Sequence, residues 1–214
     1  MKRIGLLSDT HGYWDERYAK YFAECDEIWH AGDIGSGLII DRLETICPVR
    51  AVYGNIDGQE LRMRFSEVLR FKVEDCTVMM KHIGGYPGKY DPSIKRAIYE
   101  EKPDIFIAGH SHILKVKYDN LIDCLHINPG AAGKQGWQQV RTLIKFTIDG
   151  KEIVPTAHYT VATSDYLSQG NDGLTQLQNH IELWRSEQKI RDLYIAYVQQ
   201  VKTVAAKVDG RMDL

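Results

Sequence analysis

The chain has 214 residues, of which 43% are hydrophobic and 26% are charged, and its formal net charge is −2. This length and composition are typical of a globular protein that forms one large domain, or one domain with an appendage. The slightly acidic charge argues against a surface that coats nucleic acid, although it is compatible with a local basic pocket. No stretch approaches the roughly 20 apolar residues that span a bilayer, and the first residues lack the apolar run of a signal peptide, so we expect a cytoplasmic protein.

Up to about residue 55, short apolar runs alternate with helical patterns in the order strand, helix, strand, helix, strand. We expect the first helix over residues 13–24 and the second over residues 36–45, with Ser36 as its N-cap. The spacing between the strands is that of compact βαβ units, so the strands are predicted to be parallel neighbours.

The next part of the chain changes toward a period of two residues over 68–81, which predicts a hairpin closed by Glu74 and Asp75. A glycine-rich loop at 84–90, a helix at 92–101 with proline in its first turn, and a buried strand at 105–108 are expected to follow. Four antiparallel strands are then predicted, over residues 113–118, 121–127, 140–148 and 152–161. Parallel strands first and antiparallel strands later predict an α/β fold with two sheets face to face and helices outside.

From about residue 163 the character of the sequence changes. A polar, glycine-containing segment at 164–173 is followed by two apolar stripes at three-four spacing, which run from Leu174 to Trp184 and from Ile190 to Val208. Narrow stripes of this kind are typical of a coiled-coil-like seam. We therefore divide the chain into a domain at 1–162 and a linker with a C-terminal helical extension at 163–214. Two roles stay open for the extension, namely association into a homo-oligomer and packing on the surface of its own domain.

Polar side chains that can bind metals follow five of the predicted strands. Because the carboxyl ends of parallel strands gather at one edge of a sheet, we expect these side chains to form one cluster. Carboxylate, amide and imidazole groups together suit Mn²⁺, Fe²⁺ or Zn²⁺. The candidates are Asp9, His11, Asp33, Asn55, His82, His110 and His112. Seven ligands can serve two ions about 3.5–4 Å apart if one carboxylate bridges them, which favours phosphoester hydrolysis by a hydroxide held between the ions.

Five motifs occur in order along residues 1–160. They are Asp9-Thr10-His11, Gly32-Asp33, Gly54-Asn55-Ile56-Asp57, His82 and Gly109-His110-Ser111-His112, followed by Asn128-Pro129-Gly130. Together they resemble the calcineurin-like metallophosphoesterase superfamily, in particular its small single-domain bacterial and archaeal phosphodiesterases. The resemblance implies a four-layer α/β/β/α sandwich of two mixed sheets. It also implies two divalent metal ions, with manganese expected first and nickel, iron or zinc as alternatives.

The resemblance also assigns roles by position. It implies that Asp9, His11, Asp33 and His112 hold the first ion, and that Asp33, Asn55, His82 and His110 hold the second, with Asp33 bridging. It further implies that Asp33, Asn55, His110 and His112 take part in catalysis. Two departures concern the proton donor, since Ile56 stands where the family usually has a phosphate-contacting histidine, and Ile83-Gly84 interrupts a His-Gly-His motif. Isoleucine cannot donate a proton, so we expect another donor or leaving groups that depart as anions.

Residues that could bind the substrate or replace the missing acid are less sharply marked. Asn55, Tyr86, Lys89 and His126 are the candidates. Histidines without a ligand motif, which are His30, His126, His158 and His180, are expected to be structural, with His126 the least clear because it lies just before Asn128-Pro129-Gly130.

Three functions are weighed. A phosphodiesterase acting on a small phosphoester is favoured because the small relatives are usually phosphodiesterases, while the residues alone leave a phosphomonoesterase open. A non-catalytic scaffold, as in a retromer subunit with this fold, is disfavoured because all seven ligand positions are present. A nuclease resembling Mre11 gains little from an acidic chain without a basic stripe. We expect no membrane partner and no nucleic-acid partner.

Overall fold

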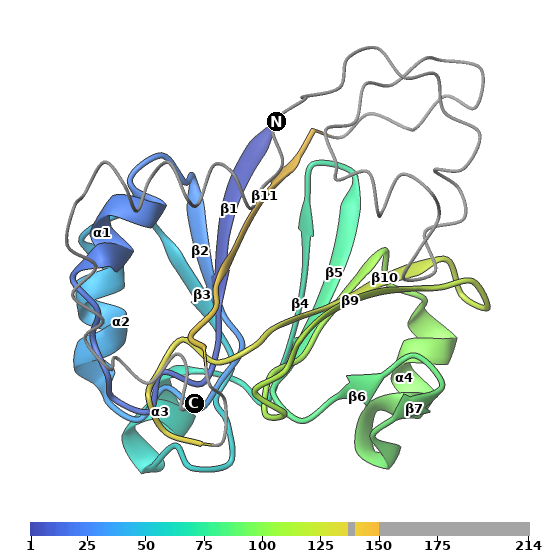
Figure 1. The fold of residues 1–214 in the computed structure, drawn as a ribbon. Helices are drawn as coiled ribbons and strands as arrows, with labels where there is room; N and C mark the ends of the chain where they lie inside the picture. The colour runs from blue at the N-terminus through green and yellow to red at the C-terminus, as the bar shows by residue number, and fades with distance from the viewer. Residues whose placement is uncertain (137–139, 150–214) are drawn as a thin grey trace, which may run out of the picture. The chain divides into compact units, whose positions relative to one another are not determined.

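The computed structural model describes residues 1–136 and 140–149, which are coloured in Figure 1. They belong to the structural unit that contains Met1–Lys151. The predicted strand at 152–161, the predicted boundary at 162 and the helical extension at 163–214 lie outside the described residues, so the division into domains and the role of the extension stay predictions. Within the described part of the chain, no helix has the length and apolar character that crossing a membrane requires.

The first sheet has four strands in the order β11, β1, β2, β3. Their bounds are β1 (Lys2–Leu7), β2 (Glu27–His30), β3 (Val49–Ala51) and β11 (Ile144–Ile148). The first three are parallel, and β11 pairs with β1 antiparallel. Helices α1 (Arg17–Phe22) and α2 (Gly37–Glu44) connect the parallel strands and cover one face of the sheet (Figure 1). The predicted strand–helix order is therefore confirmed.

The two helices differ in how well their starts were predicted. The Ser36 side chain accepts a hydrogen bond from the N–H of Leu38 at the start of α2, which confirms the predicted N-cap. Helix α1 begins later than residue 13. Its N-cap is Glu16, and the carboxylate of Asp15, one residue earlier, accepts a hydrogen bond from the N–H of Arg17 at 3.0 Å.

The second sheet has five strands in the order β4, β5, β8, β10, β9. Their bounds are β4 (Val68–Val73), β5 (Cys76–Lys81), β8 (Ile105–Ile107), β9 (Leu114–Asp119) and β10 (Cys124–Pro129). The predicted hairpin at 68–81 is confirmed as β4 and β5. The predicted antiparallel strands at 113–118 and 121–127 are confirmed as β9 and β10, and β10 also lies beside β8, parallel to it. The predicted strand at 140–148 does not continue this series, because β11 pairs antiparallel with β1 in the first sheet.

Shorter elements complete the second half of the fold. Helix α4 (Pro92–Glu101) is confirmed, with the Asp91 side chain as its N-cap. Helix α3 (Gln59–Arg64) was not predicted, because Leu61 is its single buried residue and the sequence therefore shows no apolar stripe. The loop at 84–90 contains a small hairpin of β6 (Gly85–Tyr86) and β7 (Lys89–Tyr90).

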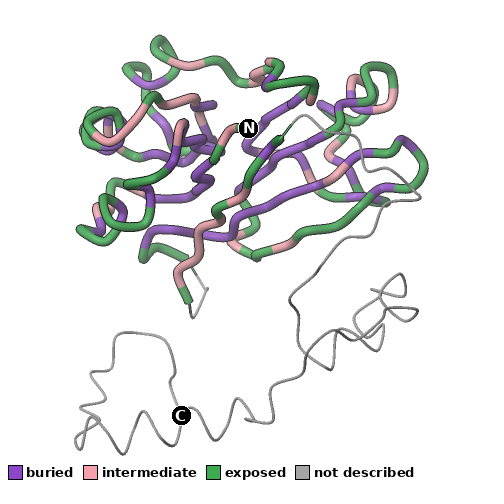
Figure 2. Tube along the Cα trace, turned by 90° about the horizontal axis from the view of Figure 1, so that it is seen from above, coloured by how far each residue is buried: buried purple, intermediate pink, exposed green. Residues whose placement is uncertain are grey.

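Three clusters of buried apolar side chains separate four layers. One lies between the two sheets and includes Leu6, Trp29 and Met80. A second packs α1 and α2 on the first sheet, and a third packs α4 on the second sheet. Figure 2 shows the resulting pattern of buried strands surrounded by exposed loops. The predicted four-layer α/β/β/α sandwich of two mixed sheets is thus confirmed for the described residues.

Candidate metal centre

The predicted metal ligands follow the carboxyl ends of strands in both sheets, after β1, β2, β3, β5 and β8. Backbone hydrogen bonds hold neighbouring strand ends together. The N–H of Asp9 donates to the carbonyl of Gly32, and the N–H of Gly109 donates to the carbonyl of His82, both at 2.9 Å. A third bond crosses from one sheet to the other, since Nδ1 of His82 lies 2.8 Å from the carbonyl oxygen of Ala31. Side chains that are distant in sequence therefore meet at one edge.

Six of the seven predicted ligands form two groups. In each group the potential ligand atoms lie within 4.8 Å of one another, and the groups are Asp9, His11, His112 and Asp33, His82, His110. In the first group, Nε2 of His112 lies 3.2 Å from Oδ1 of Asp9. In the second group, Nε2 of His82 lies 3.2 Å from Oδ1 of Asp33. This is the division that the family resemblance implies, and ion binding by these groups stays a prediction.

Asp33 faces both groups. While its Oδ1 lies beside His82, its Oδ2 lies 3.9 Å from Nε2 of His11 in the first group. The N–H of Ile56 also donates to Oδ1 of Asp33, at 3.1 Å, and fixes the carboxylate. A single carboxylate placed in this way can bridge two ions.

Five of the ligand residues have left-handed backbone conformations. Their φ angles are 54° for Asp9, 47° for His11, 52° for Asp33, 67° for His110 and 57° for His112. Residues with a Cβ atom adopt this conformation at a cost of roughly 1–2 kcal/mol each. His110 and His112 lie in the loop between β8 and β9, and both reach the metal-centre edge.

Two glycines leave room for the carboxylates. A Cβ atom on Gly54 would lie 2.0 Å from Oδ1 of Asp33. A Cβ atom on Gly109 would lie 2.1 Å from Oγ of Ser8 and 3.0 Å from Oδ2 of Asp9. The motifs therefore need glycine at both positions because larger residues would displace the carboxylates.

The site contains buried polar atoms that the described residues do not satisfy. Asp9 is 0% exposed, and Asp33 and His82 are each 2% exposed. Oδ1 of Asp9, Nδ1 of His11 and Nε2 of His82 lack a hydrogen-bond partner among the described residues. Across residues 1–136 and 140–149, no lysine or arginine lies within 4.0 Å of either carboxylate. Unsatisfied polar groups cost about 1–3 kcal/mol each, and divalent cations would satisfy this set of oxygen and nitrogen atoms, so the residues fit a metal site.

The tautomer of the neutral His82 ring suits a ligand. Its Nδ1–H donates to the carbonyl of Ala31, which leaves Nε2 to face Asp33 with a lone pair when the ring is neutral. Burial opposes the charged ring, but Asp33 and Asp9 outweigh burial and raise the pKa of His82 above its ordinary value. Burial likewise opposes ionised Asp33, yet His82 and the Ile56 N–H hold the pKa of this carboxyl below its usual range. The carboxylate is therefore ready to bind a cation, and protons compete for His82.

Two buried residues support the ligand loops, and sequence reasoning quoted both in motifs without giving them a role. The Asp57 carboxylate, 3% exposed, accepts hydrogen bonds from the N–H groups of Ile34, Gly35 and Gly54. The Asn128 side chain donates to the carbonyl of Gly109 at 2.8 Å and to Oγ of Ser111 at 3.1 Å. Asp57 thus positions the loops of Asp33 and Asn55, and Asn128 positions the loop of His110 and His112. Their positions inside the Gly-Asn-x-Asp and Asn-Pro-Gly motifs were the available signal.

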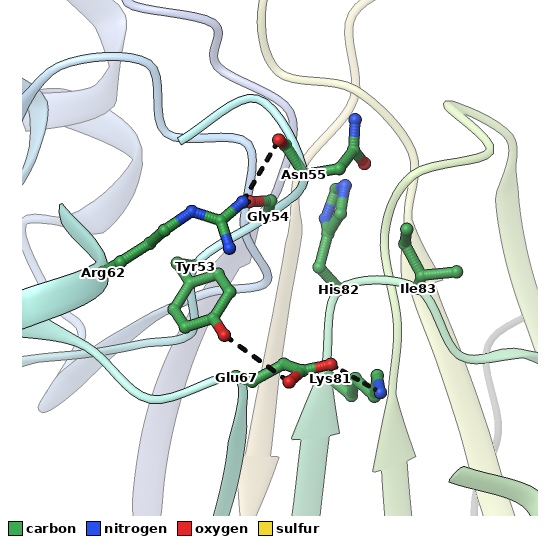
Figure 3. A pocket seen from close by; sticks show the side chains of 8 residues that line it. All are labelled: Tyr53, Gly54, Asn55, Arg62, Glu67, Lys81, His82 and Ile83. Atoms are coloured by element: carbon green, nitrogen blue, oxygen red, sulfur yellow. Dashed lines mark hydrogen bonds and ion pairs between the residues drawn. The ribbon is translucent and has the colours of Figure 1, made fainter. Parts of the chain in front are cut away.

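Asn55, the seventh predicted ligand, is exposed and lies beside His82 (Figure 3). Both residues line a cavity of about 210 Å³. The structure records no contact between the two ligand groups and the predicted substrate residues Tyr86 and Lys89, at least among the described side chains. Tyr86 instead packs under Lys115, whose Nζ lies 3.7 Å from the centre of its ring.

His126 lies apart from the ligand groups. It is 1% exposed, and its ring lies 5.8 Å from that of Phe106, a residue of the cluster under α4. Burial lowers the pKa of His126 to about 4. His30 is structural as expected, because its ring contacts Oγ1 of Thr10 and accepts a hydrogen bond from the N–H of Gly32.

Comparison with known families agrees with this geometry. The model of the calcineurin-like phosphoesterase superfamily domain matches residues 1–151. The chain belongs to this superfamily. A second model, that of the 5′-nucleotidase C-terminal domain, matches residues 124–179. The resemblance derived from the sequence motifs is therefore confirmed.

Individual relatives give the same result. A probable metallophosphoesterase of Methanothermobacter thermautotrophicus is 31% identical over 133 residues, which are 60% of this chain and 76% of that protein. Another, from Methanocaldococcus jannaschii, is 31% identical over 139 residues, 60% of this chain and 67% of that protein. The crystal structure of Vps29 from Entamoeba histolytica with zinc has a TM-score of 0.56 and 18% identity, covering 69% of this chain and 87% of that one. This last likeness shows a shared fold.

Proposed function

We propose that the protein is a two-metal-dependent phosphoesterase that hydrolyses phosphodiesters. The position of Asp33 carries this proposal, because its two carboxylate oxygens face two separate groups of ligands. Two divalent ions at such a site supply an activated water at neutral pH and bind the phosphoryl oxygens. Manganese is the ion that we expect first, with nickel, iron and zinc as alternatives.

The remaining residues have roles that follow from their grouping. Asp9, His11 and His112 would hold one ion, and His82 and His110 would hold the other. The family resemblance adds Asn55 to the second ion. Asp57 and Asn128 keep the ligand loops in place through the hydrogen bonds described above. Because these loops are tied to strand ends on a packed core, the ligands are held ready before the ions arrive.

The cavity beside Asn55 and His82 favours diesters. A diester has a second substituent that must be placed somewhere when the phosphoryl group lies at the metal centre. The cavity of about 210 Å³ offers that space directly beside the second ligand group.

The proton donor limits the range of leaving groups. Ile56 is 46% exposed at the position where the family usually has histidine, and its side chain cannot donate a proton. We therefore expect the fastest reactions with esters whose leaving group departs as a stable anion, such as 4-nitrophenolate.

The test is hydrolysis of bis(4-nitrophenyl) phosphate and 4-nitrophenyl phosphate by metal-stripped protein that is resupplied in turn with manganese, nickel, zinc or magnesium. We expect a transition metal to restore turnover, with a higher kcat/KM for the diester. A higher kcat/KM for the monoester would make the protein a phosphomonoesterase. Absence of turnover with every metal, despite binding of the ions, would contradict the enzymatic proposal.

A scaffold is the second candidate, because Vps29 structures share this fold. Vps29 of Chaetomium thermophilum, for example, has a TM-score of 0.57 and 14% identity over 70% of this chain. The scaffold requires no turnover, so the same assay separates the two functions.

A further inference from the structure

The cavity beside the metal centre is lined by more cationic than anionic side chains. Besides Asn55 and His82, it is lined by Tyr53, Arg62, Glu67 and Lys81 (Figure 3). We call this part the remote pocket. It contains two cationic side chains and one carboxylate, so its formal charge is positive even without metal ions.

Arg62 is a fixed cation without a carboxylate partner. Its Nε donates to the carbonyl of Asp57 at 2.7 Å, and its Nη2 donates to the carbonyls of Gly54 and Asn55 at 3.2 Å. The guanidinium also lies over the ring of Tyr53, 4.4 Å from its centre. These bonds go to neutral groups, and within the described residues no carboxylate lies within ion-pair distance of Arg62. Nη1 takes no part in these bonds and can donate to a ligand.

Lys81 is a second cation, at the floor of the remote pocket. Its side chain is 7% exposed, and its Nζ lies 2.8 Å from Oε1 of Glu67 and 2.9 Å from Oγ of Ser93. An ammonium has three N–H donors, so one is left after these two contacts. Glu67 is 57% exposed, which means that solvent screens much of its charge, whereas the charge of Lys81 is buried.

We propose that the remote pocket binds an anionic group, a carboxylate or a phosphate, on the part of the phosphoester that lies away from the reacting phosphorus. Nη1 of Arg62 provides the contact, because charge-assisted hydrogen bonds from a guanidinium N–H to an oxyanion are stronger than neutral ones. Lys81 adds to the positive potential from below. The inference rests on the proposed function, since it assumes that the phosphoryl group lies at the metal centre, and it names the class of substituent that the enzyme prefers.

Binding can be tested without turnover. We would titrate the manganese-loaded full chain with phosphonocarboxylates that have one to four methylene groups between the two acids, and with the matching phosphonocarboxamides. Carboxylate and carboxamide have nearly the same shape, so their difference reports on charge. For at least one length, we expect the carboxylate to bind about tenfold more tightly, as is typical of a charge-assisted hydrogen bond.

Variants locate the effect. In Arg62→Gln the preference for the carboxylate should fall to about one, while Arg62→Lys, which disturbs the same backbone hydrogen bonds but keeps the charge, should retain part of it. The matched control is Arg64→Gln, because Arg64 lies on the same helix and pairs with Asp41 and Glu44 at the surface. It should keep the full preference. Glu67→Gln removes the carboxylate of the remote pocket and should increase the preference.

The outcomes separate this inference from the proposed function. Equal binding of carboxylate and carboxamide at every length would contradict the binding of an anionic group in the remote pocket. An unchanged preference for the carboxylate in Arg62→Gln would contradict it as well. A parallel assay uses 4-nitrophenyl phosphodiesters with a 2-carboxyethyl or a 2-carbamoylethyl group. Turnover of both esters at equal kcat/KM would support the phosphoesterase and contradict the pocket. Preferential binding of the phosphonocarboxylates without any turnover would support the pocket and contradict the phosphoesterase.

Discussion

The metal-centre edge and the core between the sheets are both buried, but they are built in opposite ways. In the core, side chains such as Leu6, Met80 and Ile107 are 0% exposed, and each is worth about 1.5–3 kcal/mol of burial. At the edge, Asp9 and Asp33 are almost as deeply buried, yet they are charged and incompletely hydrogen-bonded. Five ligand residues there also have left-handed backbones.

The core between the sheets therefore stabilises the fold, whereas the metal-centre edge destabilises it. The core favours folding because its side chains are apolar. The edge opposes folding, because unsatisfied polar atoms and left-handed residues each cost about 1 kcal/mol or more. Such a region persists when the rest of the structure imposes it, and its atoms become satisfied when ions bind.

The largest effect is expected from Asp33→Ala, which removes the carboxylate shared by both ligand groups. The variant should lose both ions and about a thousandfold in activity, because bound metals contribute several kcal/mol to phosphoryl transfer. Metal analysis after dialysis and kcat/KM on an aryl diester are the measurements. Asp26→Ala is the control, since Asp26 pairs with Arg3 at the surface, and it should keep both ions. Two tightly bound ions in Asp33→Ala would contradict the proposal that Asp33 bridges the ions.

Gly54→Ala tests whether the edge depends on close approach of the backbone. The new Cβ atom would lie 2.3 Å from the backbone nitrogen of Asp33 as well as against its carboxylate, so the loop must move. We expect a loss of about 2 kcal/mol in unfolding free energy, measured in urea, with weaker manganese binding. At Gly58, an added Cβ meets nothing within 4 Å, so Gly58→Ala should cost at most about 1 kcal/mol, as an N-cap change. Equal costs for the two variants would contradict the steric explanation.

Asn128→Ala addresses the support of the His110 loop. It removes two hydrogen bonds to that loop and one from the N–H of Gly130. We predict a 10- to 100-fold loss in metal affinity, a typical range for residues that orient ligands, with a loss of about 1–3 kcal/mol in stability. Calorimetric titration with manganese measures the affinity. Asn120→Ala, an exposed turn residue, serves as the control, and unchanged affinity in Asn128→Ala would show that the loop holds its shape alone.

The last effect concerns a histidine outside the edge. Burial holds the pKa of His126 near 4, whereas an unfolded chain titrates near its ordinary value of 6.5. Between these values the unfolded chain binds more protons, so the native state loses stability as the pH falls from about 6.5 to 4. In His126→Leu, this loss between pH 7 and 4.5 should be smaller by on the order of 2 kcal/mol, measured by urea unfolding of metal-free protein. Identical pH dependence in both proteins would show that His126 has the same pKa in the native and unfolded states and would contradict the prediction.

Sequence patterns predicted those parts of the fold that depend on local periodicity. The strands before Asp9 and Asp33, the cap at Ser36 and the hairpin at 68–81 are examples, because apolar alternation and turn residues define them directly. The pairing of β11 with β1 could not be predicted, because the residue pattern of an edge strand does not indicate which sheet the strand joins.

The candidate site shows the same division. The ligand residues were recognisable from motifs at strand ends. Their left-handed backbones and the way in which Asp33 faces two groups arise from packing between loops of different strands. Arg62 and Lys81 lie in a helix and a strand without any motif, and only the folded chain brings them to one cavity.

The central claim is that the edge of the sheets is a centre for two ions. Equilibrium dialysis of the metal-stripped full chain against manganese, combined with thermal unfolding, tests it most directly. We predict two ions per chain and a rise in Tm with manganese concentration, because ions that bind the native state stabilise it. Binding of fewer than two ions, or a Tm that does not change, would contradict the account.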